Sequence, residues 1–263
     1  MDLGLEGRRA LVCAASKGLG LATARSLLAE GAVAVIAARG KKALDEAAST
    51  LEAETGKRPF TVPADLTISS EREALFAQAE RLMGGVDILV ANAGGPPSGP
   101  FESHGPEAWK LAIDLALGSV THLCALALPG MKARAFGRIV QLVSIAGVEA
   151  VDGLILSNAS RPAALGFAKA LAREVAPHGV LVNSICPGVF LTDRIRDLAV
   201  EQAKHKGVTP EAWLAGFAGD IPLGRPGRPE AVGDLAAFLA SPRNSYVTGA
   251  AVVIDGGKTR RLF

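Results

Sequence analysis

Short apolar runs alternate with longer stretches of helical periodicity along the whole chain. The apolar runs lie at residues 8–14, 33–38, 59–63, 86–91, 138–143 and 181–185, and a closing strand is expected within 246–257. Helical periodicity fills the intervals, chiefly from the first strand to residue 30 and over 41–55, 69–83, 106–131 and 228–239. This alternation predicts a doubly wound, mostly parallel α/β sheet of the Rossmann type, with right-handed crossovers and helices on both faces. We expect residues 1–263 to form a single domain.

Two prolines interrupt the helical pattern. We expect the helix over 106–131 to break or end around Pro129 and Gly130. Pro162 lacks an N–H and clashes with a preceding turn, so it fits the first turn of a helix better than the interior. The next helix, ending near residue 176, is therefore predicted to start near Pro162 or to bend there.

A glycine-rich turn joins the first strand directly to the first helix. In this strand–turn–helix context, glycines let the backbone approach a pyrophosphate, and the helix N-terminus offers it free N–H groups. A tight turn without a ligand remains the alternative. The residues expected to contact a dinucleotide here are Ala14, Ser16, Lys17, Gly18, Leu19 and Gly20.

The end of the second strand predicts which dinucleotide is preferred. An acidic residue at this point accepts hydrogen bonds from the adenosine ribose in NAD sites, but residues 37–39 offer none. Arg39, together with Lys17, is suited instead to a 2′-phosphate. The sequence therefore predicts NADP(H) over NAD(H), with two ordinary surface cations as the alternative.

Composition excludes several classes of protein. Of the 263 residues, 49% are hydrophobic, which is ample for one large buried core. The formal charge of +2 argues against a nucleic-acid binder that relies on a broad basic surface. Lys258, Arg260 and Arg261 form a small basic tail, which we expect to be solvated or inter-subunit rather than a binding module.

Cysteine usage and the N-terminal residues favour a cytoplasmic protein. Cys13, Cys124 and Cys186 lie in apolar surroundings without C-x-x-C spacing, so we expect buried free thiols and no metal site. The first ten residues lack a basic region followed by an apolar run, so no signal peptide is predicted. Polar residues interrupt the apolar run at 111–128, which favours a buried helix over a membrane span.

The segment 143–169 resembles the catalytic segment of the short-chain dehydrogenase/reductase family. There, a Ser at the end of a strand is followed about thirteen residues later by Tyr-x-x-x-Lys on a helix. Counted from Ser144, Ser157 stands at the Tyr position and Arg161 at the Lys position. The small residues that follow, and Lys169, agree with this register. The family's tetrad also has an Asn, whose position, aligned through Trp109, is Asp114 here.

The resemblance covers essentially the whole chain and is strongest to 3-oxoacyl-carrier-protein reductases. It implies that Ala14 replaces the first glycine of the family's loop, and the Cβ of Ala14 could crowd the turn. It also implies that Asp65 and Leu66 contact the adenine. An N-cap for the helix at 69–83 is the alternative role for Asp65. Further cofactor contacts are implied for Asn92, Ala93, Gly94, Pro187, Gly188, Val189 and Thr192.

The resemblance also implies how the molecule closes and assembles. Residues 192–219 should form a lid over a small-molecule substrate, with Trp213 and Phe217 lining it or packing it. Helices around 106–131 and 162–176 would pair across a dimer face, often building a tetramer. Asp114 and Arg161 are opposite charges at positions within reach of each other, so we expect an ion pair in place of the family's proton relay.

The tetrad substitutions leave the reaction open. Carbonyl reduction needs a hydride and a proton, and a Ser hydroxyl is far less acidic than a Tyr that a Lys activates. Arg161 keeps a positive charge but does not exchange protons. One interpretation is an NADP(H)-dependent oxidoreductase for a carbonyl or alcohol, in which Ser144, Ser157 or a water handles the proton.

Two other interpretations stay open. The chain could be a nucleotide-binding protein that has lost turnover, or it could use the cofactor site for another reaction, with Arg161 holding an anionic substrate. Glu149 and Asp152, on a loop facing the expected cleft, are weaker candidates for a substitute acid. Tyr246, the only tyrosine, stands at the wrong end of the chain to replace the missing one.

Overall fold

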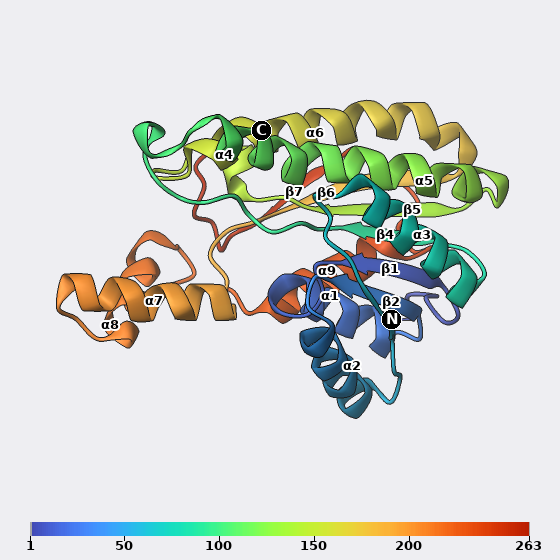
Figure 1. Cartoon of the computed structure of the whole chain (residues 1–263), viewed down its shortest axis with the longest axis horizontal. Helices are drawn as coiled ribbons and strands as arrows, with labels where there is room; N and C mark the ends of the chain where they lie inside the picture. Colours follow the sequence, from blue (N-terminus) through green and yellow to red (C-terminus); the bar gives the residue numbers. More distant parts are fainter. Residues whose placement is uncertain (1, 263) are drawn as a thin grey trace.

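The structure, a computed structural model, describes residues 2–262, without the side chains at positions 194, 198, 201, 202, 205, 206 and 217. Its centre is a seven-stranded sheet in the order β3-β2-β1-β4-β5-β6-β7, with every pairing parallel (Figure 1). This confirms the doubly wound α/β fold. The strands are β1 (Arg9–Cys13), β2 (Val33–Ala38), β3 (Phe60–Pro63), β4 (Ile88–Ala91), β5 (Gly137–Leu142), β6 (Val180–Pro187) and β7 (Ala251–Ile254).

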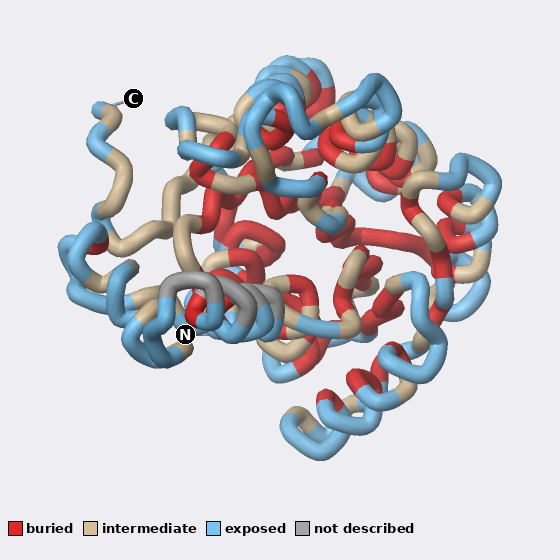
Figure 2. Tube along the Cα trace, turned by 60° about the vertical axis from the view of Figure 1, so that its left-hand side comes forward, coloured by how far each residue is buried: buried red, intermediate tan, exposed pale blue. Residues whose placement is uncertain are grey.

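The central strands are apolar along their whole length because helices cover both faces of the sheet. Every residue of β4 and β5 is buried, and Figure 2 shows the strands as a buried interior beneath exposed helices. On one face lie α1 (Gly18–Ala29), α2 (Lys41–Thr55) and α9 (Pro229–Ala240). On the other lie α3 (Ser69–Met83), α5 (Ser119–Ala133) and α6 (Ile155–Val175).

The predicted break at Pro129 and Gly130 is wrong. The helical segment runs through α4 (Pro106–Ile113), a π-helical turn η2 (Asp114–Gly118) and α5, with Pro129 inside α5. Pro129 is exposed, while Ala127 and Met131 on the inner face are buried, so packing onto the sheet carries the helix past the proline. Residues Pro106–Ala133 are also the one described helix that length and composition alone would allow to cross a membrane.

A helix start at Pro162 is also wrong. Helix α6 begins at Ile155, seven residues earlier, with Pro162 in its interior. The ring of Pro162 is exposed, while Leu156, Ser160 and Ala164 bury the opposite face. Ser157 and Arg161 therefore lie one turn apart on the same helix.

The expected lid consists of α7 (Asp193–Lys206), α8 (Pro210–Gly216) and a short 3₁₀ turn, η5 (Phe217–Asp220). Helices α7 and α8 pack against each other and extend from the body of the molecule (Figure 1). Trp213 is half-buried, and the side chain of Phe217 lies outside the described residues. Whether this hairpin closes over a substrate stays a prediction.

Candidate nucleotide and substrate site

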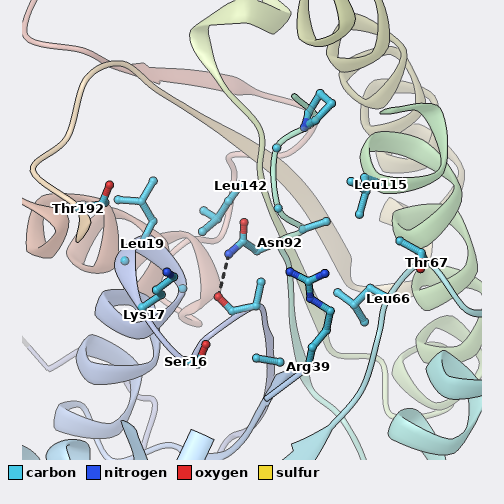
Figure 3. Close-up of a pocket in the computed structure, with 18 of the residues that line it drawn as sticks. Ser16, Lys17, Leu19, Arg39, Leu66, Thr67, Asn92, Leu115, Leu142 and Thr192 are labelled. Atoms are coloured by element: carbon cyan, nitrogen blue, oxygen red, sulfur yellow. Dashed lines mark hydrogen bonds between the residues drawn. The ribbon is translucent and has the colours of Figure 1, made fainter. Parts of the chain in front are cut away.

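A cavity of about 890 Å³ opens at the carboxyl ends of the strands. It lies where the order of the sheet reverses, between β1 and β4, which is where open parallel sheets bind ligands. The predicted cofactor residues that line it are Ala14, Ser16, Lys17, Gly18, Leu19, Gly20, Arg39, Asp65, Leu66, Asn92, Ala93, Gly94, Pro187 and Thr192 (Figure 3). Gly188 and Val189 are not among its described lining residues.

The turn after β1 keeps its tight geometry although its first glycine is replaced. Ala14 has a φ of 48°, in the left-handed region that alanine rarely adopts. A Cβ on Gly20 would lie 2.3 Å from the Ala14 carbonyl oxygen, so only glycine fits there. The expected crowding is thus accommodated as backbone strain at Ala14, and the loop remains a close-approach surface.

Helix α1 begins at this loop with its N-terminal N–H groups available. Lys17 is its N-cap, and no described side chain forms a capping hydrogen bond there. A Cβ built on Gly18 would lie 3.5 Å from the Thr192 methyl carbon, so the glycine loop faces the segment that follows β6. An uncapped helix N-terminus against a glycine loop suits a pyrophosphate.

Arg39 and Asp65 lie at the adenosine end of the cavity, where Figure 3 shows the Arg39 side chain reaching inward. The Asp65 carboxylate accepts hydrogen bonds from the Thr67 N–H at 2.9 Å and the Thr67 hydroxyl at 2.8 Å. These bonds, and then the Arg39 charge, lower the pKa of Asp65. The N-cap of α3 is Ile68, so the alternative role of Asp65 as that N-cap is wrong.

Asn92, directly after β4, joins the two strands that flank the cavity. Its side-chain N–H donates to the Ala14 carbonyl oxygen at 3.4 Å (Figure 3). Below it Cys13 is fully buried, and burial raises the pKa of its thiol to about 12. Cys13, Cys124 and Cys186 are all free and buried, as predicted.

The catalytic end of the cavity, defined by the predicted catalytic residues Ser144, Ser157 and Arg161, is more buried than the adenosine end. Ser144 follows β5, and its hydroxyl oxygen accepts a hydrogen bond from the Ala146 N–H at 3.1 Å. Ser157 is only 8% exposed, whereas Arg161 is half-buried. Of the four predicted catalytic residues, Arg161 alone is among the described residues that line the cavity.

Asp114 starts the π-helical turn and is half-buried. Its neighbour Ile113 is 51% exposed, so the burial expected from the apolar neighbours is only partial. The turn packs against α6, which carries Arg161. The ion pair expected between Asp114 and Arg161 stays a prediction.

Sequence reasoning missed part of the apolar wall. Leu111 and Leu115, on successive turns of the α4–η2 helix, line the cavity beside Pro96 and Pro97. A pair of leucines four residues apart is typical of the buried face of a helix, so the sequence did not indicate a cavity wall. The exposure of Leu111, at 37%, was not visible in the sequence.

Known proteins resemble this chain over nearly its whole length. A family model described as Enoyl-(Acyl carrier protein) reductase matches residues 13–259. Dehydrogenase/reductase SDR family member 4 of Homo sapiens is 33% identical over 259 residues, covering 98% of this chain and 90% of that protein.

Solved structures also resemble this chain over nearly its whole length. L-Sorbose reductase from Gluconobacter frateurii, complexed with NADPH and L-sorbose, has a TM-score of 0.96 at 33% identity and covers 100% of both chains. An NADPH-bound short-chain oxidoreductase from Pseudomonas aeruginosa PAO1, which contains an atypical catalytic center, has a TM-score of 0.87 at 32% identity and covers 96% of each chain.

Proposed function

Since this chain belongs to the short-chain dehydrogenase/reductase family, we propose that it is an NADP(H)-dependent oxidoreductase interconverting a carbonyl and an alcohol in a small molecule. Bound NADPH would supply the hydride. The cavity at the reversal of the strand order carries the proposal, because its adenosine end presents Arg39 and Lys17. The NADPH-bound relatives support the choice of nucleotide.

The residues present fit the nucleotide. The glycine loop admits the backbone approach that a pyrophosphate needs, since a Cβ at Gly20 would meet the Ala14 carbonyl oxygen. Arg39 and Lys17 would hold the 2′-phosphate, with Asp65 beside the adenine. Pro187 and Thr192 line the end of the cavity where the nicotinamide would lie.

We assign the proton to the hydroxyl of Ser144. Its oxygen accepts the Ala146 N–H, so the hydroxyl hydrogen remains available for the substrate oxygen, directly or through a water. Neither Ser144 nor Ser157 is among the described residues that line the cavity, but Ser144 is half-buried whereas Ser157 is only 8% exposed, so Ser144 would reach a substrate more directly. A serine donor is weaker than a tyrosine, and slow turnover is the expected consequence.

The alternative is a nucleotide-binding protein without turnover. The burial of Ser157 and the 97% exposure of Tyr246 favour it, because neither residue can act as an ordinary acid at the cavity. Both functions require the nucleotide; they differ in whether a carbonyl compound oxidises it.

The experiment titrates the protein with NADPH and with NADH, following nucleotide fluorescence. We expect NADPH to bind more tightly, and Arg39→Ala to weaken NADPH about 10- to 100-fold while sparing NADH, because a hydrogen bond to a charged group contributes about 1.5–3 kcal/mol. Arg81→Ala, at an exposed arginine on α3, is the matched control. Failure of both nucleotides to bind would overturn the proposal.

A single-turnover assay separates the two functions. Protein in excess of NADPH is mixed with carbonyl compounds while NADPH absorbance is followed. Loss of absorbance that depends on the carbonyl compound supports an oxidoreductase. A signal that stays constant across aldehydes, ketones and 3-oxo acids supports the second function.

The remaining proposals concern organisation. We propose that residues 1–263 act as one domain, that residues 192–219 close over the substrate, and that the protein is a cytoplasmic dimer or tetramer. All strands from Arg9 to Ile254 belong to one sheet, which supports the single domain.

A further inference from the structure

Two neighbouring charged side chains of α3 hold the backbone of the segment that forms the adenosine side of the cavity. Residues 64–67 follow β3, and all four line the cavity. The Glu71 carboxylate accepts a hydrogen bond from the Asp65 N–H at 2.6 Å, and Arg72 Nη1 donates to the Leu66 carbonyl oxygen. Neither Glu71 nor Arg72 is among the described residues that line the cavity. They support its wall without forming it.

Arg72 is buried, which restricts where its N–H groups can be satisfied. The residue is only 9% exposed, and a guanidinium removed from water must direct its donors to protein acceptors. Besides the Leu66 carbonyl oxygen, it reaches His122 of α5, whose Nδ1 accepts from Arg72 Nε at 3.0 Å. The His122 ring is half-buried, where α3 packs against α5. Arg72 therefore connects the cavity wall to a second helix on the same face of the sheet.

The contacts of His122 determine which of its nitrogens faces Arg72. A guanidinium carries donors and no acceptor, so Nδ1 must be the acceptor in this pair. The neutral ring then carries its hydrogen on Nε2, which lies 3.5 Å from the Glu73 carboxylate. The Ser69 hydroxyl lies 3.3 Å from Nδ1 as well. Two residues of α3 thus flank the ring and keep Nδ1 directed at Arg72.

We propose that Arg72, held by His122, is a positioning residue that fixes the Leu66 carbonyl and keeps the cavity wall in the shape that the adenosine half of the nucleotide needs. The inference rests on the proposed nucleotide-dependent function and adds residues that act on the nucleotide without touching it. Without Arg72 the buried Leu66 would lose this donor to its carbonyl oxygen, and an unsatisfied buried carbonyl is costly. Segment 64–67 would shift to satisfy it.

The first test measures binding of adenosine 2′,5′-bisphosphate and of NADPH by isothermal titration calorimetry. We expect Arg72→Met to weaken both ligands by the same factor, about 3- to 30-fold, because substitutions that touch no ligand change binding by such amounts. Arg72→Lys, which keeps a donor for the Leu66 carbonyl, should recover part of the loss. Asp87→Asn is the control for lost stability, since it removes the partner of two arginines away from the cavity and should leave both affinities unchanged.

A matched pair at His122 tests the support of Arg72. His122→Asn places an amide oxygen where Nδ1 accepts from Arg72 Nε, whereas His122→Leu offers no acceptor. We expect His122→Leu to weaken adenosine 2′,5′-bisphosphate about threefold or more, and His122→Asn to bind it like the unmodified protein. Equal affinity in the two variants would overturn the role of His122. If Arg72→Met does not fold, this pair decides alone.

Hydrogen exchange in the nucleotide-free protein separates this inference from the proposed function. The amides of residues 64–68 should exchange faster in Arg72→Met and His122→Leu, but not in His122→Asn or Asp87→Asn. Unchanged exchange in Arg72→Met, or a loss of affinity as large in Asp87→Asn as in Arg72→Met, would overturn the positioning role. If the unmodified protein binds no NADPH, the proposed function falls, and the exchange measurement still decides whether Arg72 holds the segment.

Discussion

The glycine loop beside the cavity shapes it mainly with backbone, whereas the catalytic end depends on side chains. At the glycine loop, a strained turn at Ala14, a close approach at Gly20 and an uncapped helix start shape the cavity wall. At the catalytic end, the proposed reaction depends on the side chains themselves, such as the hydroxyl of Ser144. A backbone surface tolerates a small replacement such as alanine, whereas reaction chemistry changes when the reacting group is replaced.

A small replacement in the glycine loop can therefore leave the fold of the loop intact. Ala14 keeps the turn by adopting a φ of 48°, so the shape of the loop depends on a backbone conformation rather than on one side chain. Replacing a phenol by the hydroxyl of Ser157 removes an acid that no backbone rearrangement restores.

Restoring the catalytic pair should give the largest change. Ser157→Tyr combined with Arg161→Lys should raise the rate of NADPH oxidation by a carbonyl compound about 100-fold or more, because a positioned general acid contributes about 10²–10⁴-fold. Stopped-flow absorbance measures it. Ser157→Phe with Arg161→Lys introduces the same bulk at this buried position without the hydroxyl; an equal rate in both would mean that the tyrosine does not act as an acid here.

A side chain added to the glycine loop should disrupt the proposed pyrophosphate site. Gly20→Ala places a Cβ 2.3 Å from the Ala14 carbonyl oxygen, so the turn must shift. Overpacking of this kind costs about 1–3 kcal/mol, and we expect a lower Tm together with a loss of NADPH affinity. Gly166→Ala, on an exposed face of α6 with nothing within 4 Å, is the control. Unchanged NADPH affinity in Gly20→Ala would show that the nucleotide does not use this loop.

A substitution at Asp87 should change stability without changing the cavity. Asp87 lies just before β4, at the end of the sheet opposite the cavity. Its carboxylate accepts from Arg9 Nε at 2.8 Å and from Arg134 Nε at 3.0 Å. Burial raises the pKa of Asp87, but the Arg9 hydrogen bonds and both charges outweigh burial and lower it. We expect Asp87→Asn to reduce the free energy of unfolding by about 2 kcal/mol at pH 7 without changing NADPH affinity.

The sign of the pH dependence follows from that lowered pKa. The stabilisation by Asp87 is fully present above the unfolded pKa of about 3.9 and is lost as the pH falls through the lower folded value. Urea unfolding at pH 7 and at pH 3 should therefore show the gap between Asp87→Asn and the unmodified protein closing in acid. A gap of the same size at both pH values would contradict the assigned ion pair.

Relieving the strain at Ala14 should give the smallest effect. Ala14→Gly removes a left-handed alanine, a gain of about 1 kcal/mol that the flexibility of unfolded glycine partly offsets. We expect a net stabilisation of about 0.5 kcal/mol and slightly tighter NADPH binding. Ala135, with a φ of 50° and outside the cavity lining, provides the comparison. Ala135→Gly should stabilise the protein equally and leave NADPH affinity unchanged. Tighter NADPH binding in both variants would show that the gain in affinity does not come from the glycine loop.

The sequence predicted the first strand, glycine loop and helix well because their signals are local. An apolar strand, a glycine loop and a helix follow one another within residues 9–29, so the motif and its structural context are read together. The parallel sheet and the family are likewise confirmed. The catalytic roles of Ser157 and Arg161 stay predictions, since their positions came from spacing, which does not report burial.

Proline positions show the same limit. Local chemistry predicted that one helix would break or end near Pro129 and that another would start or bend near Pro162, yet both prolines lie inside helices whose inner faces pack on the sheet. Burial of residues such as Met131 and Ala164 favours a continuous helix, and the exposed proline rings do not obstruct that packing. Tertiary contacts therefore overruled a local preference.

By itself, then, the amino-acid sequence determined the order of strands and helices, the parallel sheet and the glycine loop, because periodicity and turn chemistry act between near neighbours. Only the tertiary structure decided which distant segments meet. The hydrogen bond from the Arg260 N–H to the Glu149 carboxylate joins residues 111 positions apart, and the local sequence around neither residue predicts it. Contacts of this kind depend on how whole surfaces pack, which no local stretch of sequence encodes.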